Sequence, residues 1–175
     1  MLALVTLVLG LAAAPGCYPP PLQAPVLDPY RAPACAWCPG NRGIEYGPRP
    51  ATPVRSIAAG SVTFDGVVAG VRYVTVLGDD GVRVSYGRLA SSSVERGQRI
   101  RVGQVVGATT ERFSLSLRDG DAYVDPAPHL GEVRGRPRLV PGDGAPARPA
   151  PPGRLVCRSG ATTGARDEVR RAAGR

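Results

Sequence analysis

The feature that most constrains the fold is a two-residue alternation of side-chain character through the middle of the chain. It is clearest in "VRYVTVLG" (71–78) and recurs in "VRVSYGRL" (82–89) and "RFSLSLRDGDAYVDP" (112–126). A period of two is typical of β-strands, whose successive side chains point to opposite faces. The turn "GDDG" (78–81) joins the first two segments, so we predict a β-hairpin there.

Other segments support strands and short turns. "PVRSIAAGSVTFDG" (53–66) contains apolar residues broken by a glycine, and "VERGQRIRVGQVVG" (94–107) contains two Gly-Gln turns. No amphipathic helix of useful length is indicated by a 3.6-residue period. The sequence therefore predicts an all-β domain, a compact antiparallel β-sheet core with short turns.

Composition divides the rest of the chain. With 23 glycines and 19 prolines in 175 residues, turns and extended backbone are frequent. Residues 15–37 are rich in proline and predict an extended linker, whereas residues 141–175, rich in Pro, Gly and Arg, predict a flexible tail. The folded core is expected over residues 38–140.

The N-terminus resembles an export signal. The apolar run Leu2–Ala14 is too short to span a bilayer and predicts a signal peptide over residues 1–14, leaving no stable transmembrane segment once removed. The usual preceding basic residues are missing, which leaves a truncated start as one explanation. We expect a secreted or cell-envelope protein. Cys17 after "APG" weakly resembles a lipoprotein signal, and this anchored form is the less favoured alternative.

Export permits disulfides among the four cysteines, which allow three pairings. Cys35 and Cys38 have the C-x-x-C spacing of redox sites and zinc knuckles, but the surrounding sequence fits neither. The preferred expectation is a structural disulfide that ties this loop to Cys157. If Cys17 is lipidated or cleaved off, one of the remaining three cysteines is left free.

The charge balance narrows the partners. The formal net charge is +8, and all 22 basic residues are arginine. The arginines are scattered and not interleaved with stacking aromatic residues, which argues against nucleic-acid binding. A solvated basic surface is the structural interpretation, and affinity for anionic polymers such as cell-wall material is the functional one.

Four segments of the chain match sequence motifs of one known protein family. "NRGIEYGPRPATPVRSIAAGSVTFDG" resembles an H-R-G-x-D opening and the first strand after it, and "VRYVTVLGDDGVRVSYG" resembles a hairpin of that family. "YGRLASSSVERGQRIRVGQVVG" is similar to Y-x-H-L with the G-Q turns, and "RFSLSLRDGDAYVDP" to H-x-H through V-D-P. The chain therefore resembles the lysostaphin/LytM-type zinc metallopeptidases, enzymes that cut peptide cross-links in bacterial peptidoglycan. The resemblance implies the family's β-sheet core over about residues 38–130.

The same resemblance locates degenerate site positions. Where the family holds zinc with His, Asp and His, this chain has Asn41, Glu45 and Ser114. Where the family has two assisting histidines, it has Arg88 and Arg112. Catalytic zinc needs about three protein ligands, and arginine stays protonated, so it cannot act as a base. We expect no zinc cofactor and no catalysis.

These substitutions lead to a functional hypothesis with one alternative. The favoured hypothesis is an inactive, exported module that binds peptidoglycan or regulates a cell-wall hydrolase. The alternative is an active peptidoglycan metalloendopeptidase with unusual ligands. Glu45 is expected to pair with Arg88 or Arg112, either as a purely structural tie or as part of an anion-binding cleft for carboxylates of wall peptides.

The remaining polar residues are interpreted as structural. His129, the only histidine, is expected to be a loop or packing residue. Four aspartates fall in turn segments, where Asp is favoured because it bonds to nearby backbone: Asp79, Asp80, Asp119 and Asp121.

Overall fold

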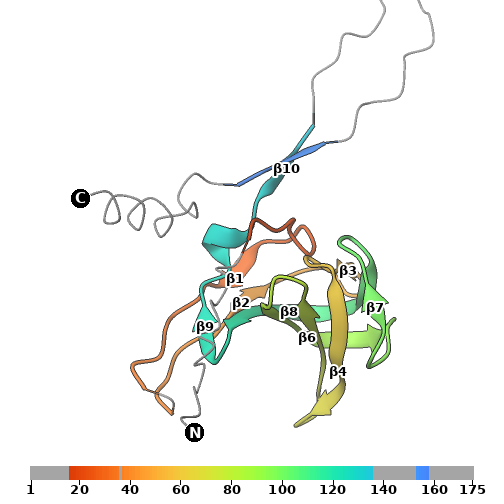
Figure 1. The fold of residues 1–175 in the computed structure, drawn as a ribbon. Coiled ribbons are helices and arrows are strands. Elements are labelled where there is room, and N and C mark those ends of the chain that lie inside the picture. The colour runs from red at the N-terminus through yellow and green to blue at the C-terminus, as the bar shows by residue number, and fades with distance from the viewer. Residues whose placement is uncertain (1–15, 36, 136–152, 158–175) are drawn as a thin grey trace, which may run out of the picture.

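A computed structural model describes residues 16–35, 37–135 and 153–157 (Figure 1). The regular secondary structure of the described part is almost wholly β-strand, which confirms the predicted all-β class. The strands are β1 (Val26–Asp28), β2 (Ile44–Tyr46), β3 (Pro53–Arg55), β4 (Gly60–Val68), β5 (Val71–Gly78), β6 (Arg83–Ser92), β7 (Arg99–Ile100), β8 (Val105–Asp119), β9 (Ala122–Val124), β10 (Glu132–Arg134) and β11 (Arg154–Val156). Within these residues the only helical element is a 3₁₀ turn, η1 (Ala127–His129), and no helix is long and apolar enough to cross a membrane.

Nine strands form one antiparallel sheet. Its order is β1-β2-β8-β6-β5-β4-β7, with β3 and β9 paired to β8. Figure 1 shows β6 and β8 crossing the middle, between β1 and β2 on one side and β4 and β7 on the other. The predicted hairpin is β5–β6. At its turn Gly81 has a φ of +85°, and the Asp80 side chain accepts the N–H of Val82 at 3.1 Å, so Asp80 forms the turn as expected.

The buried face of the sheet carries the core. Adjacent strands β2, β8, β6 and β5 contribute one row of register partners that is apolar except for one hydroxyl, each residue at most 3% exposed: Ile44, Leu115, Tyr86 and Val74. Tyr86 brings a hydroxyl into this core, and it accepts the N–H of Ile57 at 2.8 Å. The alternation seen in the sequence thus separates a core face from an opposite one.

The opposite face is called the polar face here. Each residue of the core row has a sequence neighbour that points to this face. These neighbours are also register partners: Glu45, Ser114, Gly87 and Tyr73. Directly opposed residues of antiparallel strands point to the same side of a sheet, so this row forms one continuous strip.

The proline-rich segment is not a linker, contrary to the sequence prediction. Tyr18 and Leu22 are buried in the core, and β1 pairs with β2 to extend the sheet. The Tyr18 hydroxyl also donates to Asp80 at the β5–β6 turn. Proline fixes an extended backbone but also suits an edge of a sheet, and composition alone does not distinguish the two. The folded domain therefore begins well before residue 38.

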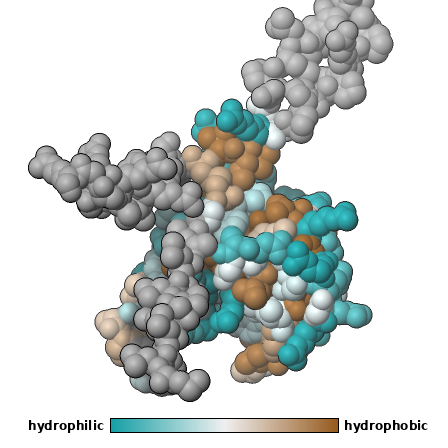
Figure 2. All heavy atoms as spheres, in the orientation of Figure 1, coloured by the Kyte–Doolittle hydropathy of each residue, from teal (hydrophilic) through white to brown (hydrophobic). Residues whose placement is uncertain are grey.

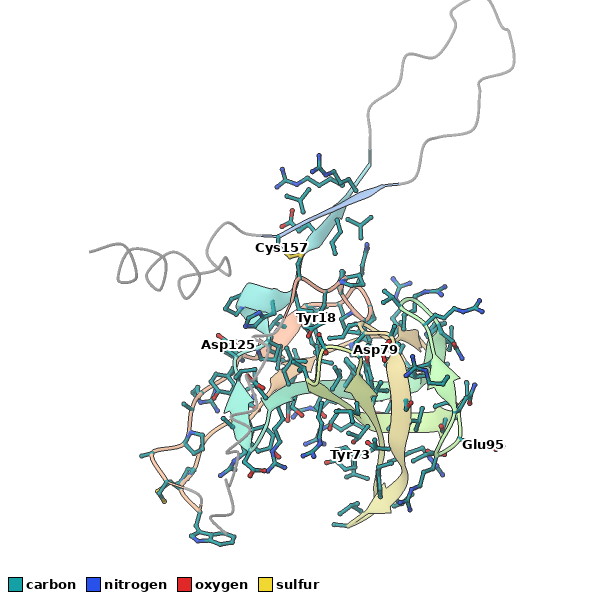
Figure 3. The ribbon with its side chains drawn as sticks, viewed as in Figure 1. Tyr18, Tyr73, Asp79, Glu95, Asp125 and Cys157 are labelled. Carbon is teal, nitrogen blue, oxygen red and sulfur yellow. A yellow bond between two sulfur atoms is a disulfide. The ribbon has the colours of Figure 1, made fainter. Side chains whose placement is uncertain are left out.

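The expected disulfide pairing is also wrong. Cys17 pairs with Cys157 across a Cα–Cα distance of 6.0 Å, and Cys35 pairs with Cys38. The cause is a contact between the two ends of the described chain: Tyr18 and Gly131 are joined by a backbone hydrogen bond of 2.8 Å, and a Cβ on Gly131 would lie 2.8 Å from the Cys157 sulfur. Figure 3 shows Tyr18 below Cys157. A sulfur in this disulfide has no free valence for a lipid.

Part of the predicted flexible tail is a strand. β11 pairs with β10 to form a small separate hairpin, with Val133 58% and Val156 38% exposed. Figure 2 shows apolar atoms gathered over this hairpin at the top of the molecule. The predicted signal peptide over residues 1–14 and the rest of the tail lie outside the described residues.

Candidate functional site

A bulge in β8 shapes the centre of the polar face. β6 and β8 are in register at Gly87–Ser114 and again at Leu89–Thr109, so Arg88 alone on β6 opposes residues 110–113 on β8. Arg88 has a φ of +61°, which is unusual for a residue with a side chain. Bulges bend a strand and redirect its side chains, and they are frequent beside functional sites.

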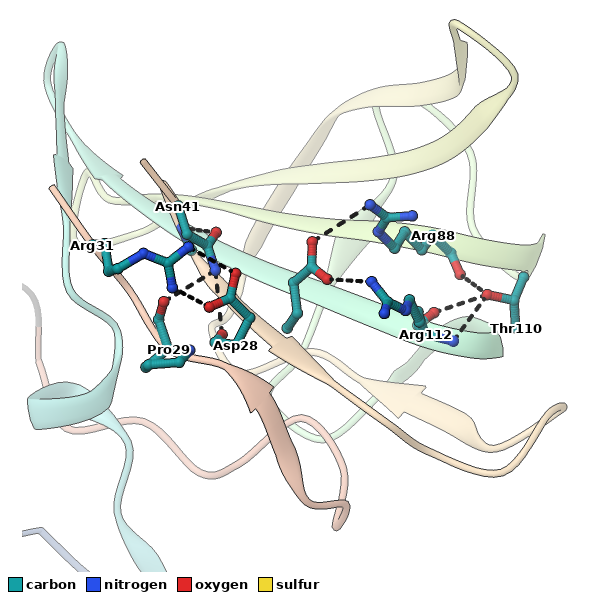
Figure 4. A network of polar contacts seen from close by, with 9 residues as sticks. Asp28, Pro29, Arg31, Asn41, Arg88, Thr110 and Arg112 are labelled. Carbon is teal, nitrogen blue, oxygen red and sulfur yellow. Dashed lines mark hydrogen bonds and ion pairs between the residues drawn. The ribbon is translucent and has the colours of Figure 1, made fainter. Parts of the chain in front are cut away.

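Thr110 fixes this bulge. Its hydroxyl lies 3.1 Å from the carbonyl oxygen of Arg88 and 2.8 Å from that of Arg112, and it accepts the Arg112 N–H at 3.3 Å. One side chain therefore links the backbones of both arginines. Figure 4 shows their guanidinium groups directed toward the same carboxylate.

That carboxylate is Glu45 of β2. Its Oε1 accepts from Arg88 Nη2 at 3.4 Å, and its Oε2 accepts from Arg112 Nη1 at 3.3 Å. The side chain of Glu45 is 19% exposed, whereas those of Arg88 and Arg112 are 40% and 59% exposed. The expected ion pair is confirmed, and it involves both arginines. Both contacts are longer than strong charge-assisted hydrogen bonds of about 2.7–2.9 Å, so a ligand can compete with them.

Asn41 serves a different network. Its side-chain nitrogen donates to the carbonyl oxygens of Asp28 at 3.2 Å and Pro29 at 3.1 Å, and its Oδ1 accepts the N–H of Gly43 at 3.2 Å. Figure 4 shows this network to one side of Arg88 and Arg112. The side chain of Asn41 thus holds the N-terminal segment against the start of β2.

Tyr73 is a member of the polar face that sequence reasoning missed. A Cβ at Gly87 would lie 2.5 Å from Cε1 of Tyr73 and 2.4 Å from Oγ of Ser114. The tyrosine ring and the serine hydroxyl therefore meet above the bare backbone of Gly87 (Figure 3 labels Tyr73). The alternation in β5 held the signal, since it places Tyr73 on the side opposite to buried Val74.

A second carboxylate on this side, Asp28, is also paired with a guanidinium group. Asp28 is the register partner of Glu45 across the β1–β2 pair. Hydrogen bonding from Arg31 holds the pKa of the Asp28 carboxyl below its usual range, with smaller contributions from Asn41 and the charge of Arg112. Asp28 and Glu45 therefore both have guanidinium partners.

These residues do not fit a catalytic zinc ion. Zinc is held by His, Cys, Asp or Glu, commonly three of them plus a water. Across the residues that the structure describes, no group of three or more such side chains could hold a metal ion. Glu45 instead lies between two guanidinium groups, and their positive charges would repel a zinc ion. His129 lies in η1, where its carbonyl oxygen accepts the N–H of Tyr18 at 2.8 Å.

The family follows from a direct sequence match. Residues 39–126, half of the chain, match peptidase family M23. The chain belongs to peptidase family M23. This confirms the resemblance found in the sequence, and the matched region contains every strand from β2 to β9.

Curated relatives are mycobacterial. The chain is 34% identical over 117 residues to the uncharacterized protein Rv2891 of Mycobacterium tuberculosis, and equally to the uncharacterized protein Mb2915 of Mycobacterium bovis. Each match covers 66% of this chain and 44% of the relative. The chain thus spans less than half the length of the curated relatives it matches.

Solved structures share the fold. Csd3 of Helicobacter pylori aligns with a TM-score of 0.58 at 16% identity, covering 75% of this chain and 40% of Csd3. The catalytic domain of the antimicrobial peptidase lysostaphin from Staphylococcus simulans aligns with a TM-score of 0.54 at 18% identity, covering 60% and 90%. A zinc-containing peptidase from Vibrio cholerae aligns with a TM-score of 0.54 at 16% identity, covering 63% and 39%.

Proposed function

We propose that this M23 domain is an exported cell-envelope module that binds peptidoglycan peptides without cleaving them. The observation that carries the proposal is Glu45 held between Arg88 and Arg112, at the positions matched to the family's metal and base residues. The family assignment supports a cell-wall target, and the two disulfides agree with export.

The chemistry of these side chains argues against hydrolysis. Metallopeptidases depend on a metal that lowers the pKa of bound water and polarises the carbonyl. Arg88 and Arg112 remain protonated and cannot accept a proton from water. Ser114 offers only a neutral hydroxyl at the third matched metal position. The group is therefore suited to binding an anion, not to generating a nucleophile.

The same group is suited to carboxylates. Stem peptides of peptidoglycan have free carboxylates, and a guanidinium binds a carboxylate through two parallel N–H bonds. Among the described contacts, each arginine reaches Glu45 through one nitrogen, although a guanidinium has five N–H donors. Glu45 reduces the repulsion between the two cations and leaves the group with one net positive charge.

Retention on purified peptidoglycan tests the proposal. Arg88→Ala and Arg112→Ala should each weaken binding about fivefold to thirtyfold, because each removes a carboxylate partner. Arg96→Ala is the matched control, since it removes the same charge from an exposed position in the β6–β7 loop. Circular dichroism verifies the fold of each variant. Unchanged retention in both single variants and in the double variant would reject the proposal.

The same preparations test the inactive state. After equilibration with zinc and desalting, we expect less than stoichiometric zinc and no release of wall peptides from intact peptidoglycan. One zinc ion per chain that is lost in Glu45→Ala, together with peptide release, would establish the metallopeptidase instead. Wall retention that requires an added cell-wall hydrolase would replace direct binding with hydrolase regulation.

A further inference from the structure

The loop over residues 31–41 is closed twice. At its base the backbones of Arg31 and Asn41 exchange two hydrogen bonds of 2.9 Å. At its tip Cys35 and Cys38 form a disulfide, and the Cys38 N–H donates to the Cys35 carbonyl oxygen at 3.1 Å. Pro33 and Pro39 further restrict the backbone. The C-x-x-C motif is thus a structural clasp.

This clasp encloses Trp37, whose exposure is exceptional. Trp37 is 96% exposed, whereas the next most exposed large apolar side chain in the described part is Val133 at 58%. Tryptophan is usually largely buried, and it is the residue type most enriched at binding hot spots. An indole displayed on a loop closed by a disulfide costs less conformational entropy when a ligand covers it than one on an open loop.

A hollow adjoins the loop and shares Cys35 with it. It measures about 720 Å³, and its lining includes Tyr30, Arg42, Asp121 and Tyr123. The Tyr30 hydroxyl donates to the Tyr123 carbonyl oxygen at 3.1 Å, which joins the two aromatic residues. The lining holds one cation, Arg42, and one anion, Asp121, so neither sign of charge dominates it. The hollow therefore suits an uncharged ligand with hydroxyl groups better than a strongly charged one.

Tyr123 itself is held by cations. The guanidinium carbons of Arg42 and Arg118 lie 6.0 Å and 5.4 Å from its ring centre, and Arg118 also pairs with Asp121 at 3.0 Å. These contacts favour one placement of the Tyr123 ring in the lining before a ligand arrives. Such preorganisation limits the entropy lost on binding.

We propose that Trp37 and this hollow form a binding site for the sugar rings of the peptidoglycan glycan strand. A pyranose ring presents a flat C–H surface that packs on an aromatic ring and an edge of hydroxyl groups that hydrogen-bond to Arg or Asp side chains. The inference rests on the proposed wall-binding function and adds a second ligand to it. Asn41 closes the loop base and also contacts Asp28, the register partner of Glu45, so the two sites are neighbours.

Neighbouring sites for glycan and peptide reinforce each other. In the wall the stem peptide is covalently attached to the glycan strand, so binding at one site raises the effective concentration at the other. Two weak contacts then give firm retention on intact peptidoglycan and much weaker retention on either component alone.

The native fluorescence of the protein offers the test, because Trp37 is the only tryptophan. The full chain is titrated with glycan strands freed of stem peptides. We expect a saturable blue shift of the emission as the indole leaves water. Trp37→Ala should weaken retention on the same strands about fivefold to tenfold, whereas Trp37→Phe should recover most of it. Val133→Ala, an exposed apolar control on β10, should leave retention unchanged.

The clasp is tested separately with Cys35→Ser combined with Cys38→Ser. This variant keeps the indole but loosens the loop, so glycan binding should weaken while Cys17–Cys157 maintains the fold. An unshifted emission with glycan, full retention by Trp37→Ala, or a shift produced only by anionic lipid vesicles would overturn the inference.

A parallel arm with soluble stem peptides separates this inference from the proposed function. If stem peptides bind in an Arg88- and Arg112-dependent manner while peptide-free glycan does not bind, only the sugar site is refuted. If neither component binds, the proposed wall-binding function fails as well.

Discussion

Two neighbouring rows of the same sheet differ in almost every respect. The row Ile44–Leu115–Tyr86–Val74 is buried and apolar apart from one hydroxyl. One residue along the same strands, the row Glu45–Ser114–Gly87–Tyr73 is polar and half-open. Both rows belong to the same four strands, so the contrast in burial and polarity lies in the side chains.

The difference explains why substitutions on the two faces should have unequal effects on the fold. Side chains of the core row fill space against one another, and a change of volume there is felt throughout the domain. Side chains of the polar face can change type without opening a cavity. Structural neighbours at 16–18% identity share the fold, which agrees with a core pattern that tolerates such replacement.

The largest contrast is expected between two adjacent residues of β8. Leu115 is fully buried, so Leu115→Ala should lower the free energy of unfolding by about 2–5 kcal/mol through lost transfer energy and a cavity. Ser114→Ala on the polar face should change it by about 0.5 kcal/mol or less. Urea unfolding of both variants measures the difference. Equal losses would show that the polar face is as essential to folding as the core.

A second contrast compares two tyrosines. The Tyr86 hydroxyl accepts the Ile57 N–H and lies 3.2 Å from the Ser56 hydroxyl, so Tyr86→Phe leaves a buried donor unpaired and should cost about 1–3 kcal/mol. Tyr73→Phe on the polar face should be close to neutral at pH 7. Comparable losses from both substitutions would contradict the assignment of the two faces.

Alkaline pH sharpens the tyrosine comparison. Burial raises the pKa of Tyr86 from 10.0 to about 12, because the core disfavours the charged phenolate. A raised folded-state pKa gives stability that is complete below the unfolded value, near pH 10, and is lost as pH rises toward 12. The wild-type protein should therefore lose stability over this window, and Tyr86→Phe should lose it less steeply. Burial of Tyr46 contributes a similar loss in both proteins.

The sequence predicted the two faces because alternation is a local property. It also predicted that Glu45 pairs with an arginine, since the family's spacing places Arg88 and Arg112 on neighbouring strands. The bulge in β8 could not be foreseen: Thr110 stabilises it through contacts with the backbone of Arg88, which is distant in the chain. The role of Asn41 was missed for the same reason, because its partners belong to a segment predicted to be a linker.

The disulfides show a further limit of sequence reasoning. Cys17 and Cys157 meet because Tyr18 packs beside Gly131 and because β10 and β11 pair, and both contacts are long-range. Composition described both of their segments as flexible. A high content of proline and glycine indicates that the periodic apolar pattern of helices and strands is missing. It does not indicate which apolar residues pack in the core, here Tyr18 and Leu22.

The smallest effect should come from the ion pairs themselves. Arg88 and Arg112 are 40% and 59% exposed and lie 3.4 Å and 3.3 Å from Glu45, so solvent screens both pairs strongly. Glu45→Gln keeps the shape of the side chain, removes its charge and should cost less than about 1 kcal/mol. A double-mutant cycle of Glu45→Gln with Arg88→Gln should give a coupling of about 0.2–1 kcal/mol that nearly vanishes in 1 M salt, where the Debye length is about 3 Å. A salt-independent coupling above about 2 kcal/mol would instead place these charges among the interactions that hold the fold together. The polar face would then be a structural device like the core row, and its arginines would have little freedom left for a ligand.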